Sequence, residues 1–271
     1  MDKQHFRKAV AFGKTLITTG DLDPVYIALS PLKENERLRT VLAYSCLYHL
    51  GAAAYIAQYS GTAYWDSLES AARNDNRAWP RGAERRHWRG EAAISAARWL
   101  RSNYEKPEQV VYRWFNGAYS PRFSHVSEEI RKTPSYGPWI AFKIADIMER
   151  CLNMKVDFSD CHLEMYEEPR RGAALLLTGD VDASIDYLGL NLVVSKLEQA
   201  LRPLKAPPRY DRLVGIAEME TVLCKYKSHC NGHYPPGKDT REVFHALDPQ
   251  RWGPLAARMK DQLLPYWRNW E

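Results

Sequence analysis

The sequence predicts an all-α protein, and three observations support this fold class. Apolar residues recur at helical spacing along almost the whole chain, and alternating strand patterns of any length are missing. Clusters of proline, glycine and aspartate separate the periodic segments, as turns between helices do. With 271 residues, of which 45% are hydrophobic and 26% charged, the chain can bury a sizeable core.

The longest periodic segment, residues 34–59, predicts a single, largely buried helix. Leu38, Val41 and Leu42 fall near one face of it, and Pro31 precedes it as a start signal. Similar spacing predicts helices over residues 91–103, 108–115, 139–153, 185–201 and 215–228. Turn-forming residues lie between these segments, at residues 19–21, 74–82, 133–138, 178–180 and 203–211.

A proline-rich stretch at residues 203–208 is the best candidate for a linker. The helices on its two sides look individually incomplete, so one packed body is favoured over two independent domains. We therefore expect a helical core over residues 1–202 and a C-terminal helical extension over residues 203–271 that packs on the same core.

Composition limits the compartment and the partners. The formal net charge of +5 permits a polyanionic partner without requiring one. The five cysteines include no C-x-x-C pair, so neither a disulfide framework nor a zinc ribbon is predicted, and a reducing cytoplasm is the expected location. The N-terminal segment is too charged for a signal peptide, and no apolar run is long enough for a membrane span, so no membrane partner is expected.

The stretch GHYPPGKD, residues 232–239, has the glycine and lysine spacing of a nucleotide-binding loop. It follows a predicted helix rather than a strand, and its two prolines donate no N–H group to a phosphate. Asp239 also stands where a hydroxyl group should meet the metal ion. These departures argue against nucleotide hydrolysis.

The cysteines and histidines around this stretch do not predict a metal site. Cys224, His229, Cys230 and His233 match no standard zinc spacing, and no other cofactor is indicated. A basic loop is the better interpretation, with Asp239 holding a cation or a substrate amine, and a solvated helix end is the alternative.

A second basic stretch, PRGAERRHWRG at residues 80–90, lies directly before a predicted helix. Arginine presents a planar fork of donors that suits phosphate, so this density of arginine predicts an anion clamp. Trp79 and Trp88 are interleaved with the basic residues and can stack on a base or on arginine. A solvated turn is the alternative interpretation.

A third stretch, TPSYGP at residues 133–138, leads into an apolar-faced helix. The free N–H groups at a helix start can hold a phosphate, and an ordinary connection between two helices explains the same pattern. Asp157 follows Gly137 by twenty residues, in a pattern that resembles the helix-hairpin-helix DNA glycosylases. That resemblance implies the catalytic carboxylate position for Asp157. Ser135 stands where these glycosylases usually have a glycine, and Trp139 stands where their bifunctional members have a lysine nucleophile. The resemblance therefore does not extend to lyase chemistry.

Three motifs together, AERRHWRG, YGPWIAFKIAD and ETVLCKYKSHCNGHYPPGKD, resemble those of the alpha-glutamyl/putrescinyl thymine pyrophosphorylase family, the amino acid:DNA transferases of bacteriophages. The likeness spans about residues 40 to 247, and the last motif is the most specific. It implies a helix-hairpin-helix glycosylase-like fold and a role in thymine hypermodification. The implied enzyme replaces the phosphate or pyrophosphate of phosphorylated 5-hydroxymethyluracil in DNA with glycine, glutamate or putrescine. A phage enzyme of this kind acts in the cytoplasm of the infected bacterial host.

This implied reaction assigns roles to the basic residues. Departing pyrophosphate develops negative charge, which Arg85, Arg86 and Arg89 can neutralise. The residues expected to contact phosphate or DNA are Arg85, Arg86, Arg89, Gly137, Lys143, Lys225, His229 and Lys238.

The implied reaction also needs a general base, because an incoming amine is protonated near neutral pH. Asp157 is the first choice, His87 the second, and His233 is a further candidate. The target nucleotide is expected to leave the base stack and to lie against an aromatic side chain. The candidates for this stacking are Tyr136, Trp139 and Trp88.

Two other function classes remain open from the sequence. A monofunctional DNA glycosylase would use Asp157 to cleave the glycosidic bond and would release a free base. A non-catalytic helix-hairpin-helix module would bind DNA through phosphate contacts alone, and Asp157→Asn would leave its binding unchanged.

Overall fold

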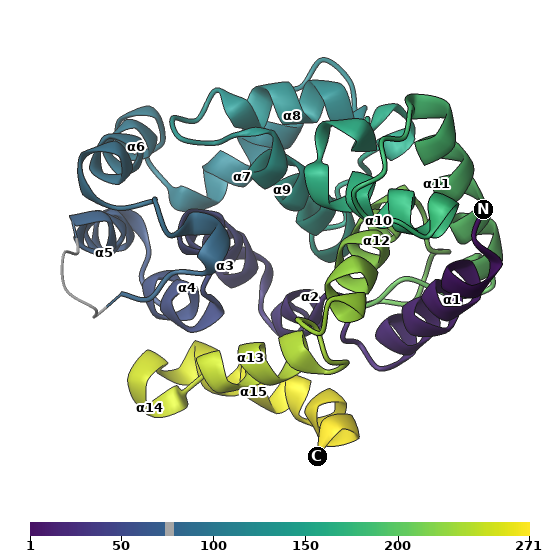
Figure 1. The fold of residues 1–271 in the computed structure, drawn as a ribbon. Coiled ribbons are helices and arrows are strands. Elements are labelled where there is room, and N and C mark those ends of the chain that lie inside the picture. Colours follow the sequence, from purple (N-terminus) through teal and green to yellow (C-terminus); the bar gives the residue numbers. More distant parts are fainter. Residues whose placement is uncertain (74–78) are drawn as a thin grey trace. The chain divides into compact units, whose positions relative to one another are not determined.

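The computed structural model describes residues 1–73 and 79–271 and consists of helices joined by short connections (Figure 1). The described residues form fifteen α-helices, and their only β-type pairings are two isolated bridges. The predicted all-α class is therefore confirmed. Residues 74–78 of the turn predicted at 74–82 lie outside the described residues. Within the described ranges, no helix combines the length and apolar character needed to cross a membrane.

The chain forms two compact units, each assembled from separate stretches of sequence. Unit 1 comprises Met1–Ile27, Phe158–Glu242 and Pro265–Glu271, and unit 2 comprises Ala28–Asp157 and Val243–Leu264. The division predicted between residues 202 and 203 falls inside unit 1, so neither unit begins or ends at the proline-rich stretch.

Four packed helices form the core of unit 1: α1 (Lys3–Thr18), α10 (Glu167–Thr178), α11 (Tyr187–Leu201) and α12 (Ile216–Cys230). Aspartates fix the starts of two of them. Asp2 accepts a hydrogen bond from the His5 N–H at 2.8 Å, and Asp186 accepts one from the Gly189 N–H at the same distance. The segments predicted at 185–201 and 215–228 correspond to α11 and α12.

Gly172 allows α10 and α12 to approach closely. A Cβ atom at this position would lie 2.4 Å from the carbonyl oxygen of Leu223, closer than real Cβ contacts. A side chain there would therefore push the two helices apart. The glycine thus helps to set the position of α12, whose C-terminal end leads into the basic loop.

The helices of unit 2 are α3 (Glu34–Leu47), α4 (Leu50–Ala57), α5 (Gly61–Arg73), α6 (Gly90–Asn103), α7 (Pro107–Asn116), α8 (Phe123–Arg131), α9 (Pro138–Cys151) and α14 (Pro249–Trp252). Helix α3 packs against α4, α7 and α9. Its residues Leu38, Val41 and Leu42, predicted to share one face, are fully buried. Helices α6, α7 and α9 lie where the sequence predicted them.

The prediction of one helix over residues 34–59 is wrong, because α3 and α4 are separate. Tyr48 has a φ angle of 51°, in the left-handed region, which ends α3. His49 then caps α4, since its Nδ1 atom accepts a hydrogen bond from the Ala52 N–H at 3.1 Å. Gly82 packs against this break: a Cβ atom there would lie 2.4 Å from the Tyr48 carbonyl oxygen.

His49 makes the stability of unit 2 sensitive to acid. Burial, assisted by Arg251, lowers the pKa of His49 from 6.5 to about 4. Between these values the unfolded chain binds a proton that the folded chain excludes. Stability therefore falls as the pH decreases through this window, by up to about 3 kcal/mol, and is unaffected by His49 above it.

We expect His49→Asn, which retains an N-cap acceptor, to flatten this pH dependence. The measurement is the urea midpoint of the wild type and the variant at about pH 7 and about pH 4.5. Equal losses of stability in the two proteins on acidification would contradict the assignment to His49.

Helices α8 and α9 and the turn between them form a helix–turn–helix unit at the predicted place. Ser135 in this turn has a φ angle of 67°, the left-handed region in which glycine is favoured. Gly137 is the N-cap of α9, and Pro138 occupies the first turn of that helix. The relationship of this unit to the DNA glycosylases stays a prediction.

Three helices contribute residues to both units: α2 (Pro24–Leu29), α13 (Lys238–Ala246) and α15 (Pro254–Trp267). The region after residue 202 contains α12 to α15 and is helical, as expected.

Candidate functional site

The most specific sequence motif, the loop between α12 and α13, closes around one buried carboxylate. The side chain of Asp21 is fully buried and accepts hydrogen bonds from the N–H groups of Gly237 at 2.7 Å and Thr240 at 2.9 Å. It also accepts bonds from the hydroxyl groups of Thr240 at 2.7 Å and Tyr234 at 3.0 Å. These four bonds fix the loop to the turn that follows α1.

The Asp21 carboxylate also takes the place at the start of α13 that a phosphate has in a nucleotide-binding loop. The free N–H groups at a helix start attract an anion, and here the Asp21 carboxylate takes that place. Gly237 has a φ angle of 82°, and a Cβ atom there would lie 2.4 Å from the ring of Trp270. The loop conformation itself therefore requires this glycine.

Lys225 and Asp239 pair with each other inside unit 1. The Lys225 Nζ atom lies 2.6 Å from Asp239 Oδ2, and it donates to the carbonyl oxygens of Asp21 at 2.6 Å and Leu22 at 2.7 Å. These contacts occupy all three ammonium hydrogens. Binding of phosphate by Lys225, or of a substrate amine by Asp239, would require one of these contacts to break.

The other basic residues of the loop lie nearer the surface. His229 and His233 are exposed, and Lys238 donates from Nζ to the His233 carbonyl oxygen at 3.1 Å. The His229 ring hydrogen-bonds through Nδ1 to the Tyr234 carbonyl oxygen at 2.9 Å and stacks on Phe12 at 4.8 Å between ring centroids. The phosphate and base roles predicted for these residues stay predictions.

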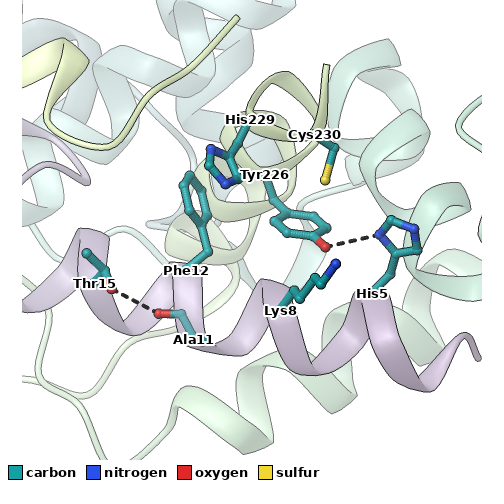
Figure 2. A pocket seen from close by; sticks show the side chains of 8 residues that line it. All are labelled: His5, Lys8, Ala11, Phe12, Thr15, Tyr226, His229 and Cys230. Atoms are coloured by element: carbon teal, nitrogen blue, oxygen red, sulfur yellow. Dashed lines mark hydrogen bonds between the residues drawn. The ribbon is translucent and has the colours of Figure 1, made fainter. Parts of the chain in front are cut away.

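A cavity of about 600 Å³ lies beside this motif, between α1 and α12 of unit 1 (Figure 2). Within it, the His5 Nδ1 atom and the Tyr226 hydroxyl group are 3.0 Å apart and share a hydrogen bond. Burial raises the pKa of the Tyr226 phenol, so this hydroxyl group keeps its proton. The side chains that line the cavity are His5, Lys8, Ala11, Phe12, Thr15, Tyr226, His229 and Cys230.

In unit 2, Arg85 joins the basic stretch to the turn before α9. Its side chain is 2% exposed, and it donates to the carbonyl oxygens of Cys46 at 3.3 Å and Ser135 at 3.0 Å. Its guanidinium carbon also lies 5.0 Å from the centroid of the Tyr136 ring. Two motifs recognised separately in the sequence, residues 80–90 and 133–138, are therefore brought together by one arginine.

We expect Arg85→Lys to destabilise the protein by about 1.5–3 kcal/mol, because the single nitrogen of lysine cannot take the two positions from which Arg85 Nε and Nη1 donate to Cys46 and Ser135. Arg86→Ala is the matched control, since the Arg86 side chain is exposed. It should leave stability within about 0.5 kcal/mol of the wild type. Urea unfolding measures both variants, and equal stabilities of the two would contradict the structural role of Arg85.

The remaining residues of the basic stretch are placed differently. Arg86, His87 and Arg89 are exposed, whereas Trp88 is 1% exposed. Partial burial, together with Arg85 and Arg86, lowers the pKa of His87, which favours the neutral imidazole that a general base needs. The structure thus leaves two arginines and one histidine of this stretch accessible.

The aromatic residues predicted to stack a base differ in exposure. Tyr136 is 5% exposed, and its hydroxyl group hydrogen-bonds with Ser45 Oγ at 2.7 Å. Trp139 is half-buried and lies edge-on to Tyr48, with ring centroids 5.2 Å apart. Tyr136 and Trp88 are thus packed inside the unit in this conformation, and Trp139 is the more accessible ring.

Gly137 is exposed at the start of α9, and nothing lies within 4 Å of the position of a Cβ atom there. Lys143, on the same helix, is 9% exposed, with its Nζ atom 5.2 Å from the Phe142 ring centroid. The helix start is therefore open to an anion, whereas Lys143 lies within the packed interior.

Asp157 has an exposed side chain and a main chain fixed by the loop between α7 and α8. Its N–H donates to the Pro121 carbonyl oxygen at 2.8 Å, and its carbonyl oxygen accepts from the Phe123 N–H at 2.8 Å. A rigid backbone with an accessible carboxyl group is what a general base requires.

This loop contains residues that the sequence analysis missed. Tyr119 is 92% exposed, and its ring lies edge-on to His125 at 5.5 Å. Ser120 Oγ and His125 Nδ1 lie 2.7 Å apart and share a hydrogen bond. In the sequence, the run GAYSPR between two helical segments was the signal of this loop. The loop becomes significant only through the main-chain hydrogen bonds that join it to Asp157.

The predicted site residues therefore fall into two groups, one in each unit. Unit 1 holds Lys225, His229, His233, Lys238 and Asp239. Unit 2 holds Arg85, Arg86, His87, Trp88, Arg89, Tyr136, Gly137, Trp139, Lys143 and Asp157. Across the part of the chain that the structure describes, no three His, Cys, Asp or Glu side chains are grouped as a metal site requires.

Comparison with known proteins covers residues of both groups. A family model described as "Amino acid:DNA transferase" matches residues 23–233. A glycinyltransferase of Pseudomonas phage PaMx11 is 36% identical over 262 residues, which cover 88% of this chain and 89% of that protein. A putrescinyltransferase of Delftia phage PhiW-14 is 28% identical over 264 residues, which cover 94% of this chain and 82% of that protein. These alignments extend across both units.

Proposed function

Because this chain belongs to the amino acid:DNA transferase family, and so is a transferase that acts on DNA, we propose that it completes a hypermodified thymine. In this proposal its substrate is a phosphorylated or pyrophosphorylated 5-hydroxymethyluracil within DNA. An amine replaces the phosphate group, and the glycosidic bond stays intact.

The observation that supports this proposal is the match of one transferase family model to residues 23–233, which include every candidate of unit 2 and Lys225, His229 and His233 of unit 1. The relatives are named for glycinyl and putrescinyl groups, which share a primary amine as their nucleophile. Both relatives are phage proteins, which supports the cytoplasm of an infected bacterial cell as the place of action.

The proposed reaction exchanges one bond at the exocyclic methylene carbon. The amine nitrogen forms a bond to this carbon, and the carbon–oxygen bond to the phosphate breaks, so that its electron pair leaves with the phosphate. The incoming ammonium must first give a proton to a base. The exposed guanidinium groups of Arg86 and Arg89 can neutralise the departing charge, while buried Arg85 holds the stretch in position.

Mass spectrometry of nucleosides tests the proposal. DNA containing phosphorylated or pyrophosphorylated 5-hydroxymethyluracil is incubated with the protein and a mixture of glycine, glutamate and putrescine, and then digested. A new nucleoside that carries the mass of one amine is the expected result. Free base with abasic DNA would identify a glycosylase, and unchanged DNA with intact binding would identify a binding module. Either outcome overturns the proposal.

We expect DNA binding to weaken steeply with salt, because the net charge is +5 and exposed basic residues are available for phosphate contacts. Contacts to about three phosphates predict a roughly forty-fold loss of affinity between about 50 and 200 mM salt. Fluorescence anisotropy with a labelled duplex measures this, and an affinity that does not change with salt would exclude phosphate contacts as the main source of binding.

A further inference from the structure

The cavity between α1 and α12 is lined by basic groups and by no acidic side chain (Figure 2). Lys8 contributes an ammonium group, and His5 and His229 contribute imidazoles. Lys8 is exposed and forms no ion pair with any residue that the structure describes. The carboxylate of Asp2, near this end of α1, is bound to the His5 N–H as the helix cap. The lining therefore offers a ligand the Lys8 ammonium group, which is not engaged in an ion pair with any described residue.

The two helices meet this cavity differently. The flank of α1 lines it from His5 through Lys8 to Thr15 and contributes the Lys8 ammonium group, which attracts a negative charge. His229 and Cys230 belong to the last turn of α12, whose C-terminal dipole favours a positive charge. A ligand with an anionic group for Lys8 and a cationic group for the end of α12, such as a zwitterion, matches this lining.

The contacts of His229 leave one of its ring nitrogens, Nε2, available as a hydrogen-bond acceptor. Its Nδ1 atom lies 2.9 Å from the Tyr234 carbonyl oxygen, and because a carbonyl oxygen can only accept, Nδ1 carries the proton. With that proton on Nδ1, the Nε2 atom is the ring nitrogen that is left to accept a hydrogen bond. Stacking on Phe12, with ring planes inclined by 21°, fixes the ring orientation. An ammonium group in the cavity can donate to Nε2.

We infer that this cavity is the binding site of the amine donor, and that the donor is an amino acid held by its carboxylate on Lys8 and by its ammonium group on His229. This inference rests on the proposed transferase reaction, and it specifies the chemical class of the amine donor. Putrescine carries two ammonium groups and no carboxylate, so Lys8 would repel it. A volume of about 600 Å³ accommodates amino acids larger than glycine as well as glycine itself.

The first test measures binding of glycine, glutamate and putrescine to the intact protein by calorimetry. The variant is Lys8→Gln, and the matched control is Lys14→Gln, an exposed lysine of α1 that does not line the cavity. Lys8→Gln should weaken binding of the amino acids roughly ten- to hundred-fold, and Lys14→Gln should leave it unchanged. DNA affinity should be the same in Lys8→Gln as in Lys14→Gln.

The same variants are then compared in the transfer assay, where Lys8→Gln should raise the KM for the amino acid by a similar factor. If Lys8→Gln weakens DNA binding and leaves amino-acid binding intact, the cavity contacts a DNA phosphate and the inference is overturned. Tighter binding of putrescine than of glycine overturns it as well. If the wild type forms no adduct with any amine, the proposed function fails, whereas an adduct with an unchanged KM in Lys8→Gln overturns only the inference.

Discussion

Replacing Asp21 with alanine is expected to destabilise unit 1 by about 3–5 kcal/mol and to release the loop between α12 and α13. The carboxylate is fully buried and satisfies two main-chain N–H groups and two hydroxyl groups. Its removal would leave the N–H groups of Gly237 and Thr240 and the Thr240 hydroxyl group without this acceptor in the interior, and the Tyr234 hydroxyl group with only the Asp21 carbonyl oxygen at 3.5 Å. The readouts are urea unfolding and hydrogen exchange of the amides of residues 234–240.

Thr240→Val provides a graded control for Asp21→Ala. It removes only the hydroxyl bond to Asp21 and keeps the branched shape of the side chain, so a loss of about 1 kcal/mol is expected. If the loop amides of Asp21→Ala exchanged their hydrogens as slowly as those of the wild type, the Asp21 carboxylate would not be the group that holds the loop.

Asp157→Asn is expected to reduce the rate of amine transfer by about 100- to 10,000-fold, the range associated with loss of a general base. The amide keeps the shape of the side chain but cannot take a proton from the incoming ammonium. The urea midpoint of the variant is measured beside its activity, so that an effect on folding is separated from the loss of the base. Single-turnover measurements with saturating donor report the loss.

Asp160→Asn, three positions along the chain, is the control for a nearby change of charge. It should transfer the amine at close to the wild-type rate. Full activity of Asp157→Asn would exclude Asp157 as the base and direct attention to His87, whose pKa is lowered by its surroundings. If Asp157→Asn unfolded at a clearly lower urea concentration than the wild type, the loss of activity would instead indicate a structural role.

The sequence predicted most of the helices whose apolar spacing is regular, such as α9 and α12, because periodicity is a local property. It failed at the junction of α3 and α4. Residues 34–59 contain no proline and their apolar spacing continues through the break, whereas Gly82 packs against Tyr48 from outside the segment. Such a tertiary contact leaves no trace in local periodicity.

The candidate site was predictable to a similar extent. The basic stretch, the turn before α9 and the loop before α13 were visible as motifs, since their composition departs from ordinary helix surfaces. Asp21 was not, because the Gly237 N–H that it binds lies 216 residues away in the chain. The burial of Arg85 and Lys225 was also hidden, since the sequence shows a charge but not the carbonyl oxygens that surround it.

The interleaving of the two units along the chain affects how the protein is made. Unit 1 needs both Met1–Ile27 and Pro265–Glu271, and Trp270 packs against Gly237 in the loop that Asp21 holds. The ribosome makes the first of these stretches before the second, roughly 10 to 50 seconds apart at about 5–20 residues per second. Until then the apolar face of α1, which includes Leu16 and Ile17, has no complete core to enter. The core of unit 1 can therefore be completed only after its C-terminal stretch has been made.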